Sequence, residues 1–138
     1  MIHKHVDWLQ SIGMVVNIAK TEAVVFARNP IDPVELDVNG TKFKTSLSMK
    51  ILGVVFDSRM KWDNHVDKIL GQAKKTLNGL RILRRNLSLD GYVHILTSQF
   101  YAKLYYSSPV WLPHVSSRDL KRLESIHYKA LRIGCNDY

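Results

Sequence analysis

The sequence has little cysteine and no long hydrophobic segment. Cys135 is the single cysteine among 138 residues, which excludes an internal disulfide and leaves no Cys-x-x-Cys zinc pattern. No run approaches the roughly 18 consecutive apolar residues of a membrane span, and the first residues lack the apolar core of a secretory signal. We therefore expect an intracellular protein, nuclear or cytoplasmic, that is not secreted and has no membrane partner.

Acidic side chains are scarce relative to basic ones. The chain has 20 Lys and Arg against 12 Asp and Glu, a formal charge of +8. Residues 1–60 hold seven basic and six acidic side chains, whereas residues 61–138 hold thirteen and six. This imbalance favours a polyanionic partner for the second half. From charge alone, a solvated basic surface without a ligand is an equal alternative.

The first half has the patterns of short helices and strands. Residues 6–12 are apolar on one side and precede Gly13, which predicts a helix closed by glycine. The β-branched and apolar residues of 14–16 and 21–26 predict strands. Strands at the edge of a sheet expose unpaired backbone groups, which invite self-association.

Two further patterns in the first half predict strands. Residues 34–38 and 41–44 alternate around Asn39–Gly40, a pair typical of a type I′ hairpin turn. Residues 49–56 are almost continuously apolar, which predicts a single buried strand covered on both faces.

The second half has helical periodicity. Apolar residues recur with a period of about 3.6 from Trp62 to Leu87 and predict one long amphipathic helix. Ser88 can cap a second helix that ends near Pro109, and Ser116 or Ser117 can cap a third. The predicted fold class is therefore α+β, with a strand and hairpin region over residues 1–58 followed by a three-helix bundle over residues 59–138.

Several segments resemble one protein family. They are GMVVNIAKTE at 13–22, LGVVFD at 52–57, WDNHV at 62–66, AKK at 73–75, LRILRR at 80–85, YYSSPVW at 105–111 and LKRLE at 120–124. In this order and spacing they resemble the reverse transcriptases of non-LTR retrotransposons of the LINE and jockey type. The resemblance covers roughly residues 8–134.

The resemblance implies a fold and a function. Residues 1–58 would be the C-terminal part of a polymerase palm, and residues 59–138 a helical thumb that grips a template–primer duplex of RNA and DNA. Further partners would be the upstream palm and fingers. No Asp-Asp pair occurs in the chain, so we expect the Mg²⁺-binding aspartates upstream of residue 1. The chain itself would need no cofactor, Mg²⁺ belonging only to the complete polymerase, and would be inactive alone.

The same resemblance assigns roles to three residues of the first half. Lys20 would be an accessory catalytic residue near the triphosphate of the incoming nucleotide. A solvated lysine at a strand edge is the alternative, and for the isolated chain it is the favoured one. Leu52 and Gly53 resemble the primer grip, a tight strand pair that supports the growing 3′ end. A buried strand that needs a small residue for packing is compatible with that role.

The residues of the long helix predict a basic surface. Lys74, Asn78, Arg81 and Arg85 recur at the helical spacing on one face, Lys68 and Lys75 add another row, and Arg84 extends the end. Such a surface placed along a duplex would contact phosphates without reading bases. We therefore predict these seven residues as the nucleic-acid-binding set.

Aromatic residues and histidines have simpler explanations than catalysis. Trp62 and His65 share a helical face with Val66, which predicts a core histidine packed beside tryptophan. The six histidines are scattered, so no metal site is predicted. For the aromatic residues between Tyr101 and Trp111, we predict packing within the helical bundle in preference to stacking on bases.

Three functions are compatible with the sequence. The first is a fragment of an RNA-directed DNA polymerase that grips template and primer without the catalytic aspartates. The second is a repurposed nucleic-acid-binding protein with no polymerase role. The third is a helical protein-interaction module whose basic surface meets an acidic protein. Binding that weakens steeply with salt would separate the first two from the third.

Overall fold

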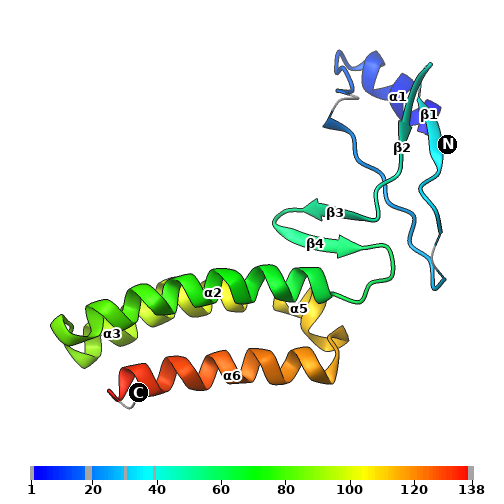
Figure 1. Ribbon diagram of the computed structural model, residues 1–138. Helices are drawn as coiled ribbons and strands as arrows, with labels where there is room; N and C mark the ends of the chain where they lie inside the picture. Colours follow the sequence, from blue (N-terminus) through cyan, green and yellow to red (C-terminus); the bar gives the residue numbers. More distant parts are fainter. Residues whose placement is uncertain (1, 18–19, 30, 39, 137–138) are drawn as a thin grey trace. The chain divides into compact units, whose positions relative to one another are not determined.

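The chain folds into two compact units, Met1–Met60 and Lys61–Tyr138. The computed structural model describes residues 2–17, 20–29, 31–38 and 40–136 (Figure 1). The first unit holds a helix and two antiparallel hairpins, and the second holds the remaining helices. The predicted α+β class is therefore confirmed.

The first unit opens with helix α1, Ile2–Ser11. The helix is closed at its C-terminal end by Gly13, whose φ of 79° lies in the left-handed region that favours glycine. The backbone N–H of Gly13 donates to the Gln10 carbonyl at 3.0 Å, and that of Met14 donates to the Leu9 carbonyl at 2.9 Å. These two bonds form a Schellman motif, as the position of the glycine predicted.

Strands β1, Glu35–Val38, and β2, Thr41–Lys44, form the predicted antiparallel hairpin, with Glu35 opposite Lys44 and Val38 opposite Thr41. The backbone N–H of Gly40 donates to the Asp37 carboxylate at 2.9 Å, which stabilises the turn. Asn39, the other predicted turn residue, lies outside the described residues.

Strands β3, Ser48–Ile51, and β4, Val54–Asp57, form a second antiparallel hairpin. The prediction of one buried strand over residues 49–56 is therefore wrong. Leu52 and Gly53 have φ angles of 47° and 89°, the two positive values of a type I′ turn. Leucine is not a typical turn residue, so the apolar run concealed the reversal of the chain.

The predicted strands at residues 14–16 and 21–26 are also wrong. Within the described ranges, this stretch makes a single isolated bridge, between Val24 and Ser46. The Ser46 N–H donates to the Ala23 carbonyl at 2.8 Å and the Ala27 N–H to the Ser58 carbonyl at 3.0 Å. β-Branched residues favour extended backbone, but a strand also needs a ladder of partners on a neighbouring segment.

The second unit begins with the long helix α2, Asp63–Leu83, followed by a 3₁₀ turn, Arg84–Asn86. Its buried face carries the apolar residues that the periodicity selected, from Val66 to Leu80. His65 lies in the same core with its ring centroid 6.3 Å from that of Trp62 and 5.3 Å from that of Trp111. The prediction of a core histidine beside tryptophan is confirmed.

Ser88 caps the next helical stretch by accepting a hydrogen bond from the Gly91 N–H at 3.1 Å, as predicted. The stretch comprises α3, Leu89–Ile95, a π-helical segment, Leu96–Tyr101, and α4, Ala102–Leu104. Because a π-helix has more residues per turn than an α-helix, residues four apart stay on one face. The buried residues are accordingly Tyr92, Leu96, Phe100 and Leu104.

Pro109 begins a helix instead of ending one. The preceding stretch stops at Leu104, and Pro109 lies in the first turn of α5, Ser108–Trp111. Proline suits this position because the first N–H groups of a helix have no partner within it. A 3₁₀ turn, Leu112–His114, then leads to the last helix.

Helix α6, Ser117–Gly134, lies beside α2 (Figure 1). Ser116 is its cap, accepting a hydrogen bond from the Asp119 N–H at 3.2 Å. Arg118 contacts Asp63 and Arg122 contacts Asp67, so the two helices run in the same direction. Among the described residues, no helix is long and apolar enough to cross a membrane.

Candidate nucleic-acid interface

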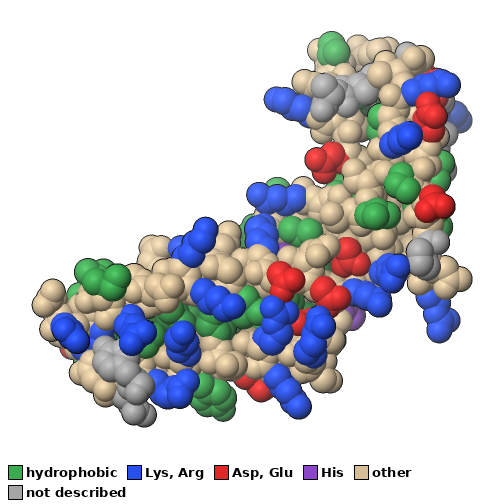
Figure 2. Space-filling model, viewed as in Figure 1, with side chains coloured by type: hydrophobic (Ala, Val, Ile, Leu, Met, Phe, Trp, Pro, Cys, Tyr) green, Lys and Arg blue, Asp and Glu red, His purple; other side chains and the backbone are tan. Residues whose placement is uncertain are grey.

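Helix α2 presents Lys74, Asn78 and Arg81 on one exposed face, as the spacing predicted, and Arg85 of the following 3₁₀ turn lines the same hollow as Asn78 and Arg81. We call these four residues the basic row. Lys74 lies one helical turn after the buried Leu70, and both residues line a groove toward α6. The basic row therefore lies next to the buried face of α2, on the side of α6. Figure 2 shows lysine and arginine side chains gathered over α2 and α6.

Lys68 and Lys75 lie on another flank of α2. One residue corresponds to about 100° around an α-helix, so Lys75 is about a quarter turn from Lys74. Lys68 is half-buried near His65. Burial lowers the pKa of His65, and the positive charge of Lys68 lowers it further. A contact of Lys68 or Lys75 with nucleic acid stays a prediction.

Arg84 has a structural position, which corrects its assignment to the binding set. Its Nε and Nη2 donate to the Gly134 carbonyl at 3.0 and 2.8 Å, and its Nη1 donates to the Leu87 carbonyl at 2.9 Å. The guanidinium carbon also lies 5.5 Å from the centroid of the Tyr92 ring. Arg84 therefore binds carbonyls at the end of α6 and in the loop after α2, because its angular position on the helix turns it toward the core.

Helix α6 contributes basic residues that the sequence analysis missed. A groove of about 530 Å³ lies between α2 and α6. Lys74 and Asn78 line it from α2, and Lys121, Ser125 and Lys129 line it from α6. These three residues recur every four positions, so helical periodicity could have found the row. Its position beside the basic row required the tertiary structure.

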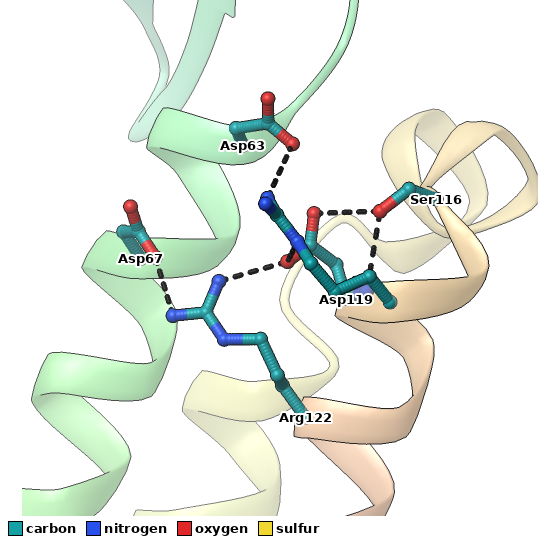
Figure 3. A network of polar contacts seen from close by, with 6 residues as sticks. Asp63, Asp67, Ser116, Asp119 and Arg122 are labelled. Carbon is teal, nitrogen blue, oxygen red and sulfur yellow. Dashed lines mark hydrogen bonds and ion pairs between the residues drawn. The ribbon is translucent and has the colours of Figure 1, made fainter.

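A network of arginines and carboxylates joins the N-terminal turns of α2 and α6 (Figure 3). Arg122 donates to Asp67 at 2.6 Å and to Asp119 at 2.8 Å, so it connects the two helices. Arg118 lies 3.4 Å from Asp63 and 3.5 Å from Asp119. The network neutralises the charge at this end of the α2–α6 contact.

Asp119 is the buried centre of the network, with no exposed surface. Burial by itself would raise its pKa, but hydrogen bonds from Arg122 and Ser116 outweigh that effect and hold the pKa at about 2. The hydroxyl of Ser116 donates to the Asp119 carboxylate at 2.9 Å. The nearby Asp119 carboxyl raises the pKa of Asp63.

These carboxylates do not fit a magnesium site. Asp63, Asp67 and Asp119 each contact an arginine. No group of three or more His, Cys, Asp or Glu side chains in the described ranges could hold a metal ion.

The residues predicted in the first unit occupy a hairpin and a loop. Leu52 and Gly53 form the turn between β3 and β4, and the Leu52 side chain is 86% exposed. Lys20 is exposed, and its backbone N–H donates to the Asn17 carbonyl at 3.1 Å. Neither observation bears on a catalytic role for Lys20.

Comparison with known proteins returned no relative: no protein-family model, curated protein or solved structure matches the chain.

Proposed function

We propose that the chain is the C-terminal part of a palm and the thumb of a reverse transcriptase similar to those of non-LTR retrotransposons. Its role is to grip a template–primer duplex of RNA and DNA. The thumb is the unit Lys61–Tyr138, with α2, the helical stretch from Leu89 to Leu104 and α6 as its three helices. The first unit is the end of the palm.

The basic row carries this proposal. Lys74 of α2 and Arg85 of the following 3₁₀ turn are exposed, and neither forms an ion pair within the described residues. Elsewhere in the same unit, Arg118 and Arg122 are neutralised by aspartates. The positive charges of Lys74 and Arg85 are therefore suited to phosphates, whose contacts bind nucleic acid regardless of base sequence.

Two features of the first unit support its assignment to a palm. A type I′ hairpin with Leu52 and Gly53 at its tip is the kind of tight strand pair that a primer grip requires. The unit also exposes large apolar side chains, including Trp8, Val15 and Phe26. Such side chains suit a surface that packs against upstream palm and fingers.

A salt series of duplex binding tests the proposal. The probe is a fluorescein-labelled RNA–DNA duplex, and the variants Lys74→Ala/Arg85→Ala and Lys44→Ala/Lys103→Ala each remove two exposed positive charges. We expect wild-type affinity to fall steeply between about 50 and 200 mM salt. The first variant should bind at least about tenfold more weakly at 100 mM salt, and the second should bind like the wild type.

Equal losses in both variants would show that binding follows net charge alone and would contradict the proposal. A flat salt dependence would favour the protein-interaction alternative. One structural feature supports a protein partner. An apolar hollow of about 230 Å³ has a lining that includes Tyr105, Leu120 and Tyr128. Polyglutamate of equal charge can be compared with unlabelled duplex as a competitor of the labelled probe. If polyglutamate displaces the probe as effectively as the duplex does, an acidic protein partner is favoured.

A further inference from the structure

The groove between α2 and α6 has the composition of a site for a sugar–phosphate backbone. Its walls carry Lys74 on α2 and Lys121 and Lys129 on α6, and the apolar residues Leu70 and Ile126 also line it. Asn78 and Ser125 add neutral groups that can donate hydrogen bonds. Ammonium, amide and hydroxyl donors on two facing walls match the acceptor oxygens of a phosphate row.

The groove lining favours the backbone over the bases. None of the described residues that line the groove is aromatic, so the groove offers no platform on which a base could stack. Lysine binds phosphate as a point charge and lacks the planar fork by which arginine recognises a base edge. Binding in the groove should therefore be insensitive to base sequence.

Charge also limits the groove at one end. Toward the N-termini of the helices, Asp67 lies on the same face of α2 as Lys74, and Arg122 of α6 is engaged by Asp67 and Asp119. Toward the C-termini, Arg81 and Arg85 continue the basic row and line a further hollow of about 570 Å³, which shares Asn78 with the groove. A phosphate row would therefore lie from Lys74 toward Arg85.

We propose that α6 forms the second wall of the nucleic-acid site, so that one sugar–phosphate backbone lies in the groove between the basic row and Lys121 and Lys129. This inference rests on the proposed function and deepens it. Five cations face the backbone: Lys74, Arg81, Arg85, Lys121 and Lys129. Neither lysine of α6 forms an ion pair within the described part of the chain.

The number of cations sets the expected salt dependence. For a duplex, each phosphate contact contributes about −0.9 to the slope of log affinity against log salt concentration. Five contacts therefore give a slope no steeper than about −4.5. Affinity would then fall about 500-fold between 50 and 200 mM salt. Loss of two contacts would reduce the slope to about −2.7 and the fall to about 40-fold.

The test measures salt slopes for three double variants of the full chain with a labelled duplex. They are Lys121→Ala/Lys129→Ala on α6, Lys74→Ala/Arg85→Ala on α2, and the control Lys44→Ala/Lys103→Ala. We expect the α6 and α2 variants each to lose about 1.8 of the slope and the control to lose none. Circular dichroism should show unchanged helicity, because all of these residues are exposed.

The outcomes separate the two proposals. If the α2 variant loses slope and the α6 variant keeps the wild-type slope, the second wall is overturned and the proposed function stands. If both keep the wild-type slope, the proposed function fails as well. Affinities for duplexes of different sequence that differ more than about tenfold would also overturn the inference, because a backbone site does not discriminate bases.

Discussion

Two consecutive arginines in the 3₁₀ turn after α2 have different positions. Arg84 donates to the carbonyls of Gly134 and Leu87, whereas Arg85 is exposed on the basic row. In the sequence the two residues are simply adjacent arginines, and nothing there distinguishes them. The difference arises because successive residues of a 3₁₀ turn point about 120° apart.

The pair allows a matched prediction. Arg84→Ala should lower the free energy of unfolding by about 2 kcal/mol, since hydrogen bonds from a charged group contribute roughly 1.5–3 kcal/mol, and should leave duplex affinity unchanged. Arg85→Ala should change stability by less than about 0.5 kcal/mol and weaken duplex binding. Urea denaturation and duplex titration measure the two effects. The opposite pattern would place Arg84 in the binding surface.

At the scale of elements, the network around Asp119 fixes how α2 and α6 pack together. Arg122 contacts Asp67 on α2 and Asp119 on its own helix, while Ser116 caps that helix and hydrogen-bonds Asp119. The alignment of the basic row with the lysines of α6 depends on this packing. The network is therefore a positioning device for the proposed groove.

The network predicts a loss of stability in acid. The pKa of Asp119 is about 2 in the folded chain against an ordinary value of 3.8, so its ionised form stabilises the fold. That contribution is complete above about pH 4 and is lost as the pH falls toward 2. The raised pKa of Asp63 acts in the opposite sense.

Urea denaturation of the wild type and of Asp119→Asn at several pH values measures this effect. The variant should be less stable than the wild type at pH 7. It should also lose less stability between about pH 4 and pH 2, the interval set by the two pKa values of Asp119. Identical pH profiles would show that other groups cause the acid dependence.

At the scale of the whole molecule, the charge division between the halves corresponds to two units of different character. The helical unit holds the cationic groove, and the first unit holds short hairpins and exposed apolar residues such as Trp8 and Val15. None of the described residues forms a candidate metal site. The proposed role of the cationic groove is to hold a template–primer duplex.

We predict that the chain alone does not extend a primer. An annealed RNA template and DNA primer with Mg²⁺ and deoxynucleotides should yield no longer product on a denaturing gel, because two-metal phosphoryl transfer needs carboxylates that hold the ions. A reverse transcriptase added to the same mixture is the positive control. Metal-dependent extension by the purified chain would contradict the prediction.

The sequence by itself determined the long helix α2, the serine caps of the following helices and the face on which Lys74, Asn78 and Arg81 lie, because helical periodicity and capping are local properties. It also determined the β1–β2 hairpin, whose alternation and Gly40 are local signals. It did not determine where the second helical stretch ends, since Pro109 begins α5. The tertiary structure decided what depends on distant partners. Residues 49–56 form a hairpin, and residues 14–16 pair with no neighbouring strand that the structure describes. Arg84 hydrogen-bonds the end of α6, and Lys121 and Lys129 lie beside the basic row. Contacts between segments far apart in the chain cannot be predicted from the residue pattern of either segment alone, because that pattern reflects only local structure.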